Sequence, residues 1–83
     1  MRILSYEIDK AFDEIFVYLT PNEAKELVER LNGLTDDHSI HHIHLDTDEL
    51  NGQFKKMLTI AIYTEDNLDD FDERSKKLIL EDK

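Results

Sequence analysis

Histidine and carboxylate side chains are the groups in this chain that could bind a metal ion or exchange protons. The four histidines fall within one short segment, at His38, His41, His42 and His44. In an extended strand His42 and His44 share a face, and a His-x-His pair can chelate a metal ion from one side. Further ligands are needed, however, and Asp46 lies about 13 Å along the strand from His42. We therefore expect no tight metal site and no cofactor, and predict that His41, on the opposite face, is a hydrogen-bonded core histidine.

Catalytic motifs are missing from the sequence. Paired carboxylates such as Asp36–Asp37 indicate a solvated surface, because 20 of the 83 residues are acidic. The only glycines are Gly33 and Gly52, so there is no glycine-rich phosphate loop. The serines lack the flanking glycines of a nucleophile elbow. We expect a protein that is not an enzyme.

The charge balance indicates which partners the chain favours. Twenty acidic against ten basic residues give a net charge of −10, which repels nucleic acid and anionic membranes and attracts a basic protein. The alternative is that the acidity only maintains solubility. There is no cysteine and no apolar run near the roughly 20 residues that span a bilayer. We expect a cytoplasmic protein in which residues 1–83 form a single domain, since so short a chain has room for one core.

Hydrophobic periodicity predicts the element order β-β-α-β-β-α. Alternating apolar residues indicate strands over 4–8 and 15–19, which we expect to be joined in a hairpin across the polar residues 9–13. Thr20, Pro21 and Glu23 form the start signal of a helix: an N-cap hydroxyl, proline in the first turn and the glutamate of a capping box. An apolar stripe follows, and Gly33 fits a left-handed helix stop. The stripe consists of Ala24, Leu27, Val28, Leu31 and Leu34.

The Asn51–Gly52 pair predicts a hairpin, because both residues tolerate the positive φ of a type I′ turn. A two-residue loop sets Leu45 opposite Leu58, Ile43 opposite Ile60 and Asp48 opposite Lys55. This register places the aliphatic residues on one face and pairs opposite charges, so pattern and turn agree.

A final helical stripe completes a two-layer α+β sandwich, which we predict as one four-stranded antiparallel sheet with two helices on one face. That stripe consists of Leu68, Phe71, Ser75, Leu78 and Ile79. The other sheet face is expected to be unusually apolar, and such faces are often covered by a partner or by a second copy of the chain. Its predicted residues are Ile3, Phe16, Tyr18, Ile40, His42, His44, Met57, Thr59 and Tyr63. The alternative is that the chain's own loops or termini cover some of these residues.

Three segments together resemble small acidic immunity proteins of bacterial polymorphic toxin systems. They are the capped helix start at 20–24, the histidine-rich strand at 40–45 and the stretch at 58–68. The resemblance implies a protein that binds a toxin domain, often a nuclease, and blocks its active site. An acidic inhibitor suits the basic substrate cleft of a nuclease.

We therefore predict a non-enzymatic binding protein, with toxin immunity as the leading function and a basic protein as the partner. The alternatives are a structural or regulatory homodimer that uses the open sheet face, and a histidine-based metal-binding protein. The predicted partner-binding residues lie on that face and in two acidic clusters. They are Phe16, Tyr18, His42, His44, Asp46, Asp48, Met57, Tyr63, Asp69 and Asp70.

Overall fold

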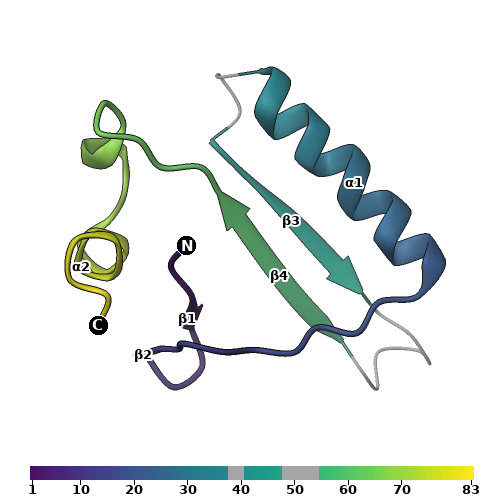
Figure 1. The fold of residues 1–83 in the computed structure, drawn as a ribbon, viewed down its shortest axis with the longest axis horizontal. Coiled ribbons are helices and arrows are strands. Elements are labelled where there is room, and N and C mark those ends of the chain that lie inside the picture. Colours follow the sequence, from purple (N-terminus) through teal and green to yellow (C-terminus); the bar gives the residue numbers. More distant parts are fainter. Residues whose placement is uncertain (38–40, 48–54) are drawn as a thin grey trace. The chain divides into compact units, whose positions relative to one another are not determined.

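The computed structural model of the chain describes residues 1–37, 41–47 and 55–83. Its elements follow the order β1 (Leu4–Ser5), β2 (Lys10–Ala11), α1 (Pro21–Asp36), β3 (His42–Thr47), β4 (Lys56–Ala61), a short 3₁₀ helix η1 (Leu68–Asp70) and α2 (Glu73–Glu81) (Figure 1). The α+β class and two α-helices are as predicted. No helix in the described part of the chain is long and apolar enough to cross a membrane.

The chain divides into two compact units. We call residues 18–62 the helix–hairpin unit, and residues 1–17 together with 63–83 the terminal unit. The single four-stranded sheet that we predicted is not formed by the described residues. They form two separate antiparallel sheets of two strands each, β1–β2 and β3–β4.

Helix α1 begins where the sequence predicts. The Thr20 hydroxyl accepts a hydrogen bond from the Glu23 N–H at 3.2 Å, and the Glu23 carboxylate accepts one from the Thr20 N–H at 2.8 Å. These two bonds complete the capping box. The predicted stop at Gly33 is wrong: the helix continues to Asp36, and the Asp37 N–H donates to the Gly33 carbonyl at 3.1 Å.

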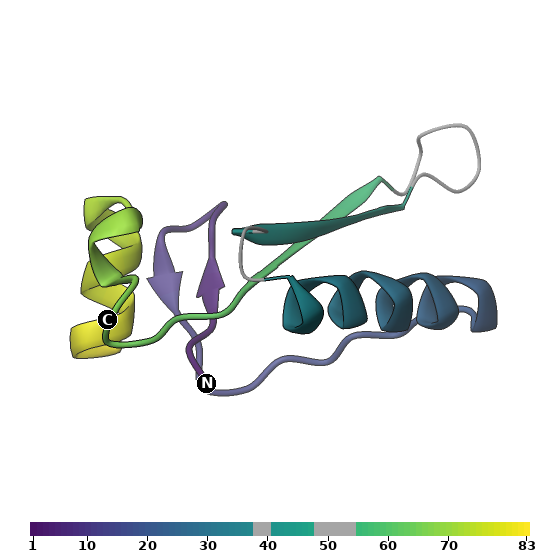
Figure 2. The same cartoon turned by 90° about the horizontal axis from the view of Figure 1, so that it is seen from above.

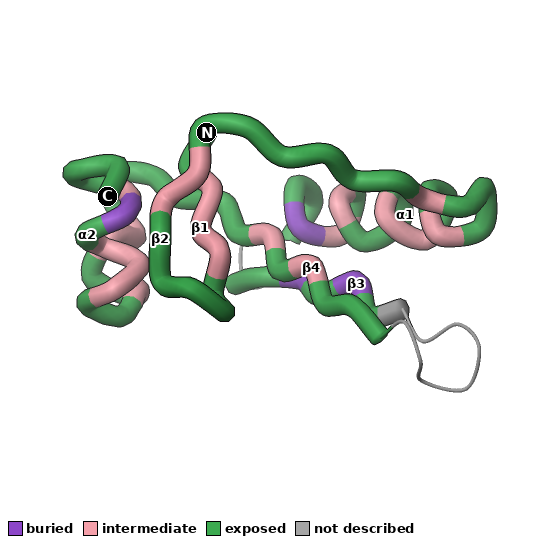
Figure 3. Tube along the Cα trace, turned by 90° about the horizontal axis from the view of Figure 1, so that it is seen from below, coloured by how far each residue is buried: buried purple, intermediate pink, exposed green. Residues whose placement is uncertain are grey.

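The β3–β4 hairpin has the predicted register, with Ile43 opposite Ile60 and Leu45 opposite Leu58. Ile43 and Leu45 are buried, and α1 packs against β3 (Figure 2). Leu34 is the buried residue of α1. Figure 3 shows that the rest of the α1 trace is of intermediate burial or exposed. The Asn51–Gly52 turn and the pairing of Asp48 with Lys55 lie outside the described residues.

The N-terminal hairpin turns earlier than the sequence predicts. Leu4 pairs with Ala11 and Ser5 with Lys10, so the predicted strand at 4–8 is cut short by a turn at 6–9. Asp9 has φ 53°, a left-handed conformation that aspartate tolerates better than most residues. Residues 15–19, predicted as the second strand, carry no strand assignment. The alternating pattern identifies extended chain but does not locate the reversal.

Helix α2 also starts later than predicted, after η1 and a break at 71–72. Its N-cap is Asp72, whose Oδ1 accepts a hydrogen bond from the Ser75 N–H at 2.8 Å. Its C-cap, Asp82, is left-handed with φ 56°, and its N–H donates to the Leu78 carbonyl at 2.9 Å. The aspartate cap at Asp72 therefore sets the start of α2, although the apolar stripe in the sequence begins earlier, at Leu68.

Candidate functional site

One face of the β3–β4 hairpin packs against α1, and the opposite face is exposed. We call the exposed face the open face. It is formed by His42, His44, Asp46, Met57, Thr59 and Ala61. Strand pairing sets them in three cross-strand pairs, because side chains two residues apart share a face and opposite residues lie side by side.

A hydrogen bond spans the open face at its centre. His44 Nδ1 lies 2.7 Å from the Thr59 hydroxyl oxygen, and these two residues are directly opposite in the ladder. A histidine beside a hydroxyl is also the first requirement of an activated nucleophile. Here the pair lies on an exposed strand surface where water competes for both groups, so we interpret it as a cross-strand bond that fixes the orientation of the His44 ring.

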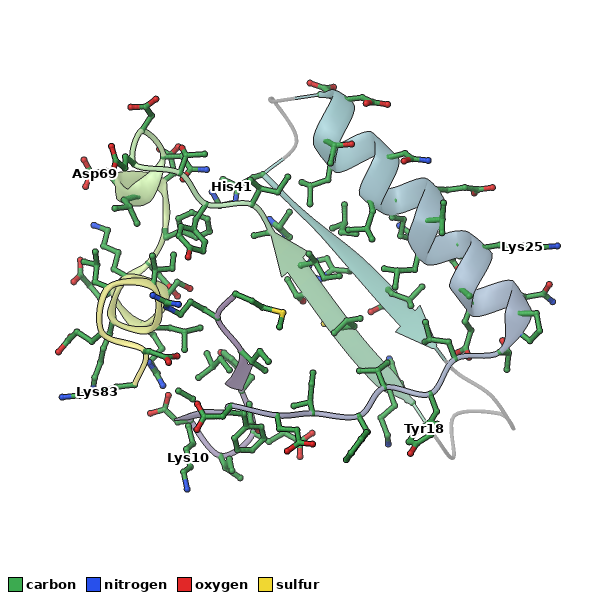
Figure 4. The ribbon with its side chains drawn as sticks, in the orientation of Figure 1. Lys10, Tyr18, Lys25, His41, Asp69 and Lys83 are labelled. Carbon is green, nitrogen blue, oxygen red and sulfur yellow. The ribbon has the colours of Figure 1, made fainter. Side chains whose placement is uncertain are left out.

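Three histidine rings form a continuous row at the start of β3. The His42 and His44 ring centroids are 4.7 Å apart in an edge arrangement, and the His41 and His42 centroids are 5.6 Å apart. His41 Nδ1 also lies 3.4 Å from His42 Nδ1. Figure 4 labels His41 at this end of the hairpin.

His41 corrects our sequence-based expectation of a core histidine. It is exposed, because the ladder begins at His42 and strand alternation does not extend to the preceding residue. The sequence does not show which residue of β3 is the first to pair with β4. In the structure that residue is His42, opposite Ala61 at the end of β4.

The structure brings together four of the ten predicted partner-binding residues. His42, His44, Asp46 and Met57 lie on the open face, and Met57 keeps 64% of its surface exposed. Asp48 lies outside the described residues.

The remaining predicted residues belong to other segments. Tyr18 lies on the extended chain before α1, and Phe16 and Tyr63 belong to the terminal unit. Asp69 and Asp70 are neighbours in η1, and Asp69 Oδ1 is 3.8 Å from Lys76 Nζ. The predicted set is therefore not one contiguous surface of a single strand pair.

Electrostatic and metal-binding features of the described residues are modest. Hydrogen bonds from the Ser75 side chain, and then from its backbone N–H, hold the pKa of Asp72 below its ordinary value of 3.8. No three His, Asp or Glu side chains among the described residues converge to hold one metal ion.

Comparisons with known proteins were also made. No protein-family model matches the chain. Neither the search of curated proteins nor the search of solved structures gave a significant match.

Proposed function

We propose that this chain is a non-enzymatic binding protein, specifically an immunity protein that neutralises a basic toxin. The observation that carries the proposal is the contrast between the two faces of the β3–β4 hairpin. One face is buried against α1, which gives the hairpin a fixed support, while the open face exposes imidazole, carboxylate, thioether and hydroxyl groups together. Partner-binding surfaces combine apolar and polar groups, and methionine is enriched in them.

The net charge of −10 supports a basic partner. Asp46 lies on the open face, and Asp69 and Asp70 form a separate acidic pair in η1. Opposite charge raises the rate at which a basic protein meets this one, and like charge disfavours nucleic acid. A nuclease toxin fits these requirements, because its substrate cleft must attract phosphates. As part of the same proposal we place the protein in the cytosol, where such a toxin acts.

Growth rescue tests the proposal directly. The probe is the C-terminal domain of a large secreted protein encoded beside this gene, expressed with and without the chain. The proposal predicts that co-expression restores growth and that the two purified proteins form a stoichiometric complex. Absence of both rescue and complex formation contradicts it.

The association rate then identifies the surface. Because exposed charges act mainly on encounter, the rate constant for association should fall steeply with salt, while dissociation changes less. Asp46→Lys should slow association if the open face is used, and Asp69→Lys with Asp70→Lys if η1 is used. Glu29→Lys is the matched control, since it reverses one exposed charge on α1 outside both clusters. A rate that is indifferent to salt and to both reversals would falsify electrostatic steering.

A homodimer is the second candidate, favoured by the large apolar side chains that stay exposed. Tyr18 is 88% exposed and Met57 64%. If these apolar residues pair two chains, replacing Tyr18 and Met57 by lysine should give a folded monomer in sedimentation equilibrium. A wild-type chain that is already monomeric at high concentration contradicts the dimer.

A further inference from the structure

The contact between His41 and His42 is unusual for neighbouring residues, whose side chains point to opposite faces within a strand. His41 precedes the first paired residue of β3, and its Nδ1 atom lies 3.4 Å from the Nδ1 atom of His42. The ring planes are at 86° to each other, so the rings meet through their edges. Both side chains are exposed.

We propose that His41 and His42 form a two-histidine site for Zn²⁺ or a similar imidazole-binding divalent transition metal ion. Zinc binds imidazole nitrogen at about 2.0–2.1 Å with tetrahedral angles, which requires two ligand nitrogens about 3.3–3.4 Å apart. The Nδ1 atoms of His41 and His42 already have that separation. Hard ions such as Mg²⁺ prefer oxygen ligands and are not expected to bind here.

The protons of the two rings must be placed differently in the bound state. In the contact between the Nδ1 atoms one ring donates its N–H and the other accepts it. A metal ion needs a lone pair from each, so both rings carry their proton on Nε2 when the ion is bound. This exchange of tautomer moves one proton from Nδ1 to Nε2 through solvent and releases no net proton while both rings are neutral.

His44 has a positioning role in this site. Its Nδ1 is engaged by the Thr59 hydroxyl at 2.7 Å, while its ring packs against that of His42 with centroids 4.7 Å apart. The contact restricts the His42 ring, as outer groups do around metal ligands. Since no third His, Asp or Glu among the described residues completes a site, water fills the other positions. We therefore expect an affinity on the order of micromolar, weaker than that of a complete zinc site.

Calorimetric titration tests the inference, using zinc chloride and the full chain freed of any purification tag. We expect one ion per chain. His41→Ala and His42→Ala should each weaken binding by at least about tenfold, equivalent to about 1.4 kcal/mol. His44→Ala should weaken it less, and Lys56→Ala, a substitution at an exposed position outside the histidine row, should not change it. All four positions are exposed, and circular dichroism verifies folding.

Chemical shifts of the imidazole protons give a second readout that does not depend on heat. Zinc should shift the His41 and His42 signals most, because their Nδ1 atoms are the proposed ligands. Absence of saturable binding, or binding unchanged by His41→Ala, overturns the inference. Nanomolar binding lost in His44→Ala assigns the metal to the His42–His44 pair instead and also overturns it. Toxin rescue does not enter these measurements, so the two proposals fail separately.

Discussion

The two units of the chain are stabilised by different kinds of interaction. The helix–hairpin unit contains three of the four buried apolar side chains in the described residues, Leu34, Ile43 and Leu45. The terminal unit contains the fourth, Leu78. It is stabilised in addition by hydrogen bonds from arginine side chains to residues distant in the sequence. Arg2 Nε donates to the Ile79 carbonyl at 3.0 Å, and Arg74 donates to the Asp9 carboxylate and to the Lys83 carbonyl.

This difference indicates how each unit depends on its sequence. Apolar packing is non-directional and follows periodicity, so the helix–hairpin unit tolerates shape-conserving changes in its core. Hydrogen bonds from a guanidinium group require specific acceptors at specific distances, so the terminal unit depends on single residues. The predictions below test this contrast.

The largest effect is expected from Leu45→Ala. Leu45 is only 2% exposed, and removing its side chain leaves a cavity between β3 and α1 that should cost about 2–5 kcal/mol of unfolding free energy. Met57→Ala on the open face is the control and should change stability by less than about 0.5 kcal/mol. Urea unfolding and amide hydrogen exchange in β4 measure the change of stability in each of the two variants. Equal losses would contradict the assignment of a buried and an open face.

Arg74→Ala should have the next largest effect, about 1–2 kcal/mol, because it removes the bonds to Asp9 and to the Lys83 carbonyl. The loss is no larger because Asp9 is 75% exposed and water screens its ion pair with Arg74. Arg30→Ala is the matched control: its pair with Glu26 lies on the surface of α1 and should be worth about 0.3–0.5 kcal/mol. Hydrogen-exchange rates of the α2 backbone amides measure the loss of stability in the Arg74→Ala variant. Equal losses of stability in Arg74→Ala and Arg30→Ala would show that the hydrogen bonds of Arg74 do not stabilise the terminal unit.

Thr20→Ala should cost about 1 kcal/mol, since it leaves the Glu23 N–H without its capping hydroxyl. Thr20→Ser retains the hydroxyl and should restore most of the loss. Thermal unfolding of both variants, followed by the helical circular dichroism signal, gives the comparison. A serine variant as unstable as the alanine variant would point to lost packing of the threonine methyl group.

Gly33→Ala should stabilise the chain by about 0.4–1 kcal/mol, because Gly33 lies inside α1 and alanine restricts the unfolded chain more. The left-handed stop that the sequence suggested makes the opposite prediction, since alanine resists positive φ. The sign of the change in midpoint of urea unfolding distinguishes the two conformations.

The smallest effect concerns pH and Asp72. Because hydrogen bonds from Ser75 lower the pKa of Asp72 in the folded chain, they stabilise α2 fully above the ordinary value of 3.8, and the contribution is lost as the pH falls through the lower folded pKa. Ser75→Ala removes the side-chain bond and should return the Asp72 pKa part of the way toward 3.8. Carboxyl carbon chemical shifts measured against pH test this. An unchanged Asp72 titration in the variant would exclude the hydroxyl as the main cause.

Elements with strong local signals were predicted well. The capping box at Thr20–Glu23 depends on residues three positions apart, and it is present. The pairing of Leu45 with Leu58, predicted from a two-residue loop and strict alternation, is also present. The predicted helix stop at Gly33 and the predicted N-terminal hairpin were both wrong, because in each case the local pattern is compatible with more than one structure. A glycine can continue a helix as well as end it, and alternation over residues 4–19 does not locate the reversal that Asp9 provides at φ 53°.

The candidate site was predictable only in part. Strand alternation correctly gathers His42, His44 and Asp46 on one face, and the hairpin register adds Met57 and Thr59 opposite them. His41 was assigned to the core because the same rule was extended one residue beyond the first paired position.

The sequence by itself determined the composition of this protein's surface and its local structure: the acidic charge, the start of α1, and which residues of the β3–β4 hairpin face inward. These properties depend on side chains within a few residues of each other. Only the tertiary structure decided that the strands form two separate pairs, that Arg74 reaches Asp9, and that the Nδ1 atoms of His41 and His42 meet. Such contacts depend on where each strand begins and ends, and those limits are set by competition between local caps, turns and the packing available to the whole chain.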